Sequence, residues 1–103
     1  MNVKTRKNVP LTLATLEKAA ATLRALAHPH RLKIVEELLG TQHTVGELAQ
    51  ALSLAPPAVS QHLNFMKAHR LLDARRQGRS VYYRVASPHA VNVINCIRKH
   101  GPQ

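Results

Sequence analysis

The fold is decided by residues 44–66, which read TVGELAQALSLAPPAVSQHLNFM. Thr44 followed three residues later by Glu47 is the pattern of a capping box, in which each side chain accepts a hydrogen bond from the other residue's backbone amide. A helix is therefore expected to begin here. A second helix is expected to open at Pro56-Pro57, because proline is tolerated in the first turn of a helix. The segment thus predicts two short helices joined by a tight turn.

The stretch that follows predicts a β-hairpin. After Leu72 the period of the apolar residues changes from 3.6 to 2, and the alternation runs to Val85, as in a strand. Gln77-Gly78 is a turn signal that divides the stretch into two strands. The tip of this hairpin holds arginines and no acid, and these arginines are Arg75, Arg76 and Arg79.

Three more helices are predicted around this unit. From Leu11 the apolar residues recur at steps of three or four up to Ala27, and His28-Pro29 then breaks the helix. The next helix runs to a C-terminal cap at Gly40, and Ser87-Pro88 begins the last one. The predicted fold is mostly α with a small β-hairpin (α+β), a winged helix-turn-helix of five helices and a two-stranded wing.

The composition is that of one small basic domain. The 103 residues carry 15 Lys or Arg against 5 Asp or Glu, a formal net charge of +10, which points to a polyanionic partner. The single cysteine excludes an intrachain disulfide. No apolar run approaches the ~20 residues that a membrane span needs. We therefore expect a cytoplasmic protein without a membrane partner.

Double-stranded DNA is the polyanion that suits this arrangement best. An α-helix fits the major groove, and Gln61 is the leading candidate for reading a base because glutamine pairs bidentately with adenine. The hairpin can lay Arg79 along the backbone or into the minor groove, while the net charge supplies nonspecific attraction. The predicted DNA contacts are Ala58, Ser60, Gln61, His62, Asn64, Lys67, Arg75, Arg76 and Arg79.

Four stretches of the sequence resemble the ArsR/SmtB family of bacterial repressors. They are residues 26–34 (LAHPHRLKI), 44–49 (TVGELA), 57–63 (PAVSQHL) and 77–83 (QGRSVYY). The resemblance extends over about residues 16–97. It implies a homodimeric transcriptional repressor that binds a pseudo-palindromic operator and is released when an inducer changes the dimer.

The resemblance also implies that the first and last helices pair in the dimer. From the residues alone, the apolar stripe of the first helix has two interpretations, an ordinary core face or a dimer interface. We assign residues 1–10 to a flexible basic N-terminal arm and residues 11–103 to the DNA-binding and dimerisation domain. The predicted interface residues are Leu16, Ala20, Leu23, Val93 and Ile97.

One departure from the family pattern lies just before the second helix of the decisive segment. The family often has serine where this chain has Ala55. Loss of the hydroxyl costs about 1 kcal/mol of helix capping. Pro56 partly compensates, because it keeps Ala55 in the extended conformation that an N-cap needs.

The cysteine-based sites of the family are absent. The Cys pair of the arsenic-type site is replaced by Thr44 and Gly46, which do not bind a soft metal ion. Thiol-sensing relatives generally use two cysteines, and this chain has only Cys96. We expect Cys96 to be a small packed hydrophobe rather than a redox switch.

A second type of family metal site lies on the last helix and is only half present. Its Asp-x-His and His-x-x-His pattern becomes Ser87-x-His89 and His100-x-x-Gln103. Within one helix His89 and His100 are about 16 Å apart, so they meet only across an antiparallel dimer. We expect no metal and no cofactor. The alternative is a metal-responsive repressor with a degenerate site at His89 and His100.

Three other classes of function are less consistent with the sequence than a regulator. An enzyme is disfavoured because the five carboxylates form no paired-carboxylate or Ser-His-Asp constellation. A winged helix can serve as a protein-interaction module, although the arginines of the wing argue against that use. Nonspecific chromosome coating predicts steep salt dependence with little preference between sequences.

Overall fold

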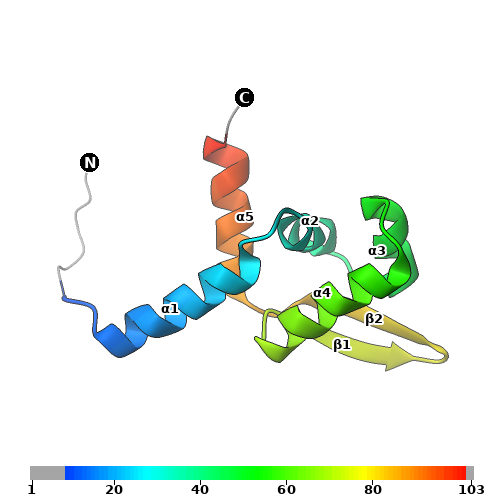
Figure 1. The fold of residues 1–103 in the computed structure, drawn as a ribbon, viewed down its shortest axis with the longest axis horizontal. Coiled ribbons are helices and arrows are strands. Elements are labelled where there is room, and N and C mark those ends of the chain that lie inside the picture. The colour runs from blue at the N-terminus through cyan, green and yellow to red at the C-terminus, as the bar shows by residue number, and fades with distance from the viewer. Residues whose placement is uncertain (1–8, 102–103) are drawn as a thin grey trace.

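The computed structural model describes residues 9–101, so the basic arm expected over residues 1–10 lies almost wholly outside the described residues. All the predicted elements are present in the predicted order, and Figure 1 shows their arrangement. The helices are α1 (Leu13–Leu26), α2 (Pro29–Leu38), α3 (Val45–Leu52), α4 (Pro56–Ala68) and α5 (Pro88–His100), and the strands are β1 (Leu72–Gln77) and β2 (Ser80–Val85).

One cluster of buried apolar side chains joins these elements. α4 contributes Val59, Leu63 and Met66, which are fully buried. Removing such a side chain from water stabilises the fold by about 1.5–3 kcal/mol. The other members come from the other four helices and from the start of the hairpin; they are Ala25, Leu26, Ile34, Val35, Leu38, Leu48, Ala49, Leu71, Leu72, Ala90 and Ile94.

The first helix lies mostly outside this cluster. In Figure 1, α1 runs out from the body of the molecule, and α5 stands across the end of α1 nearest α2. Only Ala25 and Leu26 at the C-terminal end of α1 are buried. The interpretation of the α1 stripe as an ordinary core face is therefore wrong for a single chain, because residues 9–101 leave Leu13, Leu16 and Leu23 71%, 45% and 54% exposed.

The capping box predicted at the start of α3 is confirmed. The Thr44 hydroxyl accepts a hydrogen bond from the Glu47 amide at 3.1 Å, and the Glu47 carboxylate accepts one from the Thr44 amide at 2.9 Å. The bond from the Thr44 amide lowers the pKa of Glu47 because it stabilises the charged carboxylate. The box satisfies two amides that the first turn of a helix leaves without partners.

Replacing Thr44 by alanine is expected to lower the free energy of unfolding by about 1 kcal/mol, the usual cost of losing an N-cap hydroxyl. Urea denaturation followed by circular dichroism measures this change. Thr41→Ala is the matched control, because within residues 9–101 the Thr41 hydroxyl makes no hydrogen bond. An unchanged urea midpoint for Thr44→Ala would show that the box contributes nothing.

The second helix of the pair starts without a side-chain cap, as expected. Ala55 is extended (φ −67°, ψ 141°) and its side chain makes no capping bond, while prolines occupy the first two helical positions. Ser53 adopts a left-handed conformation (φ 57°) between α3 and α4. This residue ends α3 and begins the short connection, residues 53–55, that leads into α4.

The wing is a regular antiparallel hairpin that projects beyond the helices (Figure 1). β1 pairs with β2 from Leu72 opposite Val85 to Gln77 opposite Ser80. Gly78 has φ +64° in the turn, a conformation that glycine adopts without steric cost. Among the described residues, no helix is both long enough and apolar enough to cross a bilayer.

The expectation for Cys96 is wrong. Its side chain is exposed rather than packed. The reason is its position on α5, because it follows the buried Ile94 by two residues and therefore points about 200° away around the helix.

Candidate nucleic-acid interface

The exposed face of α4 carries the polar residues expected to meet DNA. Gln61, Asn64 and Lys67 are exposed and recur every three residues, so they follow one side of the helix. The buried residues of α4 lie on the opposite side, against the core. Ala58 and Ser60 are half-buried; Ser60 directly precedes Gln61, and Ala58 lies about one turn nearer the start of α4.

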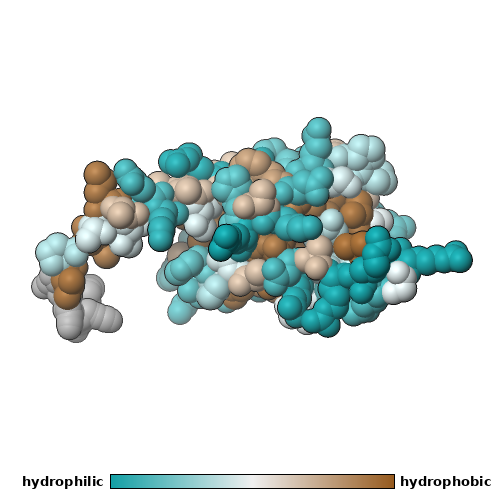
Figure 2. Space-filling model, turned by 90° about the horizontal axis from the view of Figure 1, so that it is seen from below, coloured by the Kyte–Doolittle hydropathy of each residue, from teal (hydrophilic) through white to brown (hydrophobic). Residues whose placement is uncertain are grey.

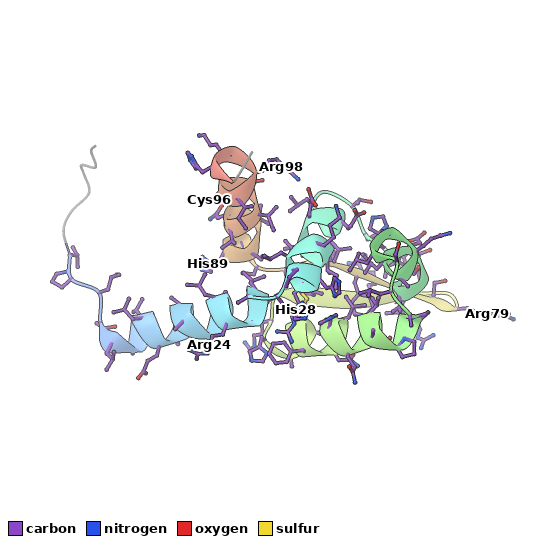
Figure 3. All side chains as sticks on the ribbon, turned by 45° about the horizontal axis from the view of Figure 1, so that its top comes forward. Arg24, His28, Arg79, His89, Cys96 and Arg98 are labelled. Carbon is purple, nitrogen blue, oxygen red and sulfur yellow. The ribbon has the colours of Figure 1, made fainter. Side chains whose placement is uncertain are left out.

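The wing places cationic side chains beyond the body of the molecule. Arg75, Arg76 and Arg79 are exposed, and no ion pair holds any of them in the part of the chain that the structure describes. Arg79 extends from the tip in Figure 3, and Figure 2 shows the same end of the molecule as a hydrophilic projection. The carboxylate of Asp73 on β1 lies 3.7 Å from Arg84 on β2. The wing therefore retains a net positive charge.

His62 does not lie with the exposed residues of α4. Its ring is half-buried against α2, and its Nδ1 accepts a hydrogen bond from Nε of Arg31 at 3.3 Å. Burial lowers the pKa of His62, and the nearby His28, Arg31 and His30 lower it further because they oppose a second positive charge. A neutral ring can accept the bond from Arg31. The sequence-based assignment of His62 to DNA is thus not supported by its placement.

Arg31 connects three helices at this point. Besides the bond to His62 on α4, its Nη1 donates to the carbonyl oxygen of Ala25 on α1 at 3.2 Å. Its guanidinium carbon also lies 3.9 Å from the ring centroid of Phe65, a cation–π contact. Arg31 therefore helps to fix α4 relative to α1 and α2. This contact could not be predicted from the sequence, because nothing local pairs residue 31 with residues 62 and 65.

Three histidines gather beside Arg31. His28 and His30 at the start of α2 and His62 on α4 each offer a ligand nitrogen, and these atoms lie within 4.8 Å of one another. The ring centroids are 4.6–5.9 Å apart. The sequence shows the His-x-His spacing at residues 28–30, but only the fold brings residue 62 to it. Figure 3 labels His28 where α1 meets α2.

At the two family metal positions, the hydroxyls of Thr44 and Ser87 act as helix caps. The Thr44 hydroxyl is engaged in the capping box, and the Ser87 hydroxyl accepts the Ala90 amide at 3.4 Å as the cap of α5. His89 and His100 are exposed near opposite ends of α5, and Gln103 lies outside the described residues. Within residues 9–101, the one group of three or more potential ligands is the histidine cluster at α2 and α4.

An apolar surface is left uncovered along α1 and α5. Leu16, Leu23 and Ile97 are 45%, 54% and 44% exposed, and Ala20 and Val93 beside them are half-buried. Brown, apolar side chains are visible on the projecting α1 end in Figure 2. All five predicted interface residues therefore lie on the two helices named for the dimer, with surface available for a partner.

Taken together, the helix pair, the exposed polar face of α4 and the arginine-bearing hairpin define a protein of the winged helix-turn-helix class. Comparison with known proteins gives the family. A family model described as "Bacterial regulatory protein, arsR family" matches residues 28–74. The chain belongs to this family of regulators, and the expectation that it is not an enzyme is confirmed by its relatives, which are transcriptional regulators.

Two curated relatives illustrate the similarity. The chain is 43% identical over 79 residues to the HTH-type transcriptional repressor SmtB of Mycobacterium tuberculosis, an alignment that covers 77% of this chain and 58% of SmtB. It is 32% identical over 97 residues to the transcriptional activator HlyU of Vibrio cholerae, with 90% of each chain covered. The chain thus spans less than two thirds of the length of SmtB and most of the length of HlyU.

Solved structures share the fold. HlyU from Vibrio cholerae superposes with a TM-score of 0.78 at 32% identity, over 82% of this chain and 92% of HlyU. The homodimeric winged helix-turn-helix DNA-binding domain of Mb0332 from Mycobacterium bovis gives a TM-score of 0.75 at 29% identity, over 84% and 81% of the two chains. The predicted fold class is confirmed.

Proposed function

We propose that two copies of this chain form a homodimer that binds a pseudo-palindromic DNA operator and represses transcription until a signal releases it. The observation that carries the proposal is the exposed polar stripe of α4 beside a wing whose three arginines form no ion pair within residues 9–101. The α4 helix fits the width of the major groove of DNA, and the wing can follow the DNA backbone or enter the minor groove.

The dimer is supported by the apolar surface of α1 and α5. A chain of 103 residues that leaves Leu16, Leu23 and Ile97 about half exposed gains stability by covering them with a second copy. The Mb0332 domain is described as homodimeric, which supports the same assembly here. Two-fold symmetry then presents two recognition helices, about 34 Å apart, to successive major grooves on one face of DNA.

The proposed contacts divide by chemistry. Gln61 reads a base and Asn64 and Ser60 lie close enough on α4 to assist, with Ala58 at the entry of the helix. The cationic side chains hold phosphates or the minor groove, and they are Lys67, Arg75, Arg76 and Arg79. We further propose that the bound dimer represses transcription rather than activates it, although relatives of both kinds are similar to this chain. SmtB is named a repressor and HlyU an activator.

Replacing Arg79 by alanine is expected to weaken binding to all DNA sequences by a similar factor. The reason is that a phosphate contact carries no sequence information. The slope of log K against log salt is expected to become shallower by about 0.9 for each lost phosphate contact, or by about 1.8 for the two contacts that a homodimer loses. Fluorescence anisotropy over a salt series measures both effects. Lys99→Ala at the end of α5 is the control, and a loss confined to the operator would contradict the phosphate role.

A genomic binding footprint is the experiment that tests the proposed function. Purified chain is mixed with genomic DNA fragments, and the bound fragments are sequenced. The expected result is a small number of sites that share an inverted repeat and overlap promoters. Uniform coverage of the genome would favour nonspecific coating instead.

A further inference from the structure

We propose that His28, His30 and His62 form a binding site for a divalent transition-metal ion of the kind that imidazole ligands favour, such as Zn²⁺ or Co²⁺. The three ligand nitrogens lie within 4.8 Å of one another. Around a tetrahedral ion with Zn–N bonds of 2.0–2.1 Å, such nitrogens are about 3.3 Å apart. Small rotations of the rings therefore bring them into position, and water completes the fourth position.

The three ligands come from two helices that the fold already holds together. His28 and His30 lie at the start of α2, and His62 lies in the middle of α4. All three side chains are half-buried, so an ion can enter from solvent while the site keeps a defined shape. Neither family metal position overlaps this cluster.

The ion must compete with Arg31 for His62. In the structure the Nδ1 lone pair of His62 accepts the Arg31 Nε–H, so in the neutral ring the proton lies on Nε2. An ion bound at Nδ1 displaces Arg31. An ion bound at Nε2 requires the proton to move to Nδ1, where it faces the Arg31 N–H. Both routes break the bond between Arg31 and His62.

His28 is subject to the same constraint. Its Nδ1 accepts the backbone amide of His30 at 3.1 Å and caps α2, so metal binding at either ring nitrogen removes that cap. The site is therefore less preorganised than a dedicated structural metal site. It also links the ion to the position of α4, because Arg31 holds α4 against α1 and α2.

The test is a Co²⁺ titration of the untagged full-length chain after treatment with a chelator. We expect one Co²⁺ per chain, with the visible absorption of a four-coordinate nitrogen and oxygen complex and without the thiolate band that Cys96 would give. Zn²⁺ is expected to displace the Co²⁺ and to raise the midpoint of thermal unfolding.

Matched variants locate the ion. His30→Ala and His28→Asn, in which asparagine preserves a side chain suited to the N-cap, are expected to lose binding. His89→Ala is expected to retain it. Loss of binding in His89→Ala with retention in His30→Ala would place the ion on α5 and overturn the proposal, as would the absence of any saturable binding.

The Co²⁺ affinity of the variant Arg31→Met distinguishes a metal site from a purely structural role of the histidines. This variant removes the charge and the N–H donor but keeps a long apolar side chain against Phe65. Co²⁺ affinity is expected to rise by about tenfold, the effect of removing one competing hydrogen bond to a charged group. Unchanged or weaker affinity in a variant that unfolds at the wild-type temperature would contradict competition at His62. None of these measurements uses DNA, so their outcome is separate from that of the proposed repressor function.

Discussion

Replacing Leu23 and Ile97 together by glutamate is expected to yield a folded monomer with little operator affinity. Both side chains are about half exposed in the single chain, so the substitution leaves the core intact. In the dimer each glutamate carboxylate would be buried in an apolar interface without a hydrogen-bond or ion-pair partner. Burial of an unpaired charge raises the free energy of the dimer and therefore disfavours it. A dimer gains about 10²–10⁴-fold in affinity by linking two half-site contacts, and the variant is expected to lose this gain.

Analytical ultracentrifugation and anisotropy with an operator duplex measure the two effects. The wild-type protein is expected to sediment as a dimer, with twice the 11.4 kDa mass of one chain. The variant is expected to sediment as a monomer, with the mass of one chain. Thr41→Glu with Asn95→Glu makes the same change in charge at exposed positions outside the predicted interface and is the control. A variant that stays dimeric, or a monomer that keeps full operator affinity, would show that α1 and α5 do not form the functional interface.

Replacing Gln61 by alanine is expected to cost about 1–3 kcal/mol of operator binding, or about 5- to 150-fold in affinity. The loss should be confined to the specific sequence. The side chain is exposed on α4, where it can donate to and accept from an adenine edge. Affinity for scrambled DNA is expected to change little, because the arginines and lysine that contact phosphates remain.

Competition binding against duplexes with each base pair changed in turn measures the specificity. The variant should tolerate substitution at one position per half-site that the wild type discriminates. Gln42→Ala, in the exposed segment before α3, controls for the loss of a glutamine elsewhere. If the variant kept the full wild-type preference at every base pair, Gln61 would not be a base-reading residue.

The elements of the fold were predictable because their signals are local. The capping box at Thr44 and Glu47 and the prolines that open α4 and α5 are each set by residues a few positions apart. The turn at Gly78 and the alternation in β2 mark the hairpin in the same way. Each feature lowers the free energy of one conformation whatever surrounds it, so the sequence alone identifies it.

The partners of side chains across the fold were not predictable in this way. The apolar period of α1 predicts a helix but not what covers it, and the structure shows that a single chain leaves it open. His62 shares a helix with Gln61, yet one step around the helix turns its ring toward Arg31. The histidine cluster depends on a contact between residues 30 positions apart or more, which the packing of α2 on α4 creates.

The most direct measurement is a titration of an operator duplex, found by footprinting, against a scrambled duplex of equal length and composition. At physiological salt the operator is expected to bind one dimer per inverted repeat at least about 10³-fold more tightly than the scrambled duplex. Equal affinity for the two duplexes, or saturation by one chain per operator, would contradict a dimeric, sequence-specific regulator.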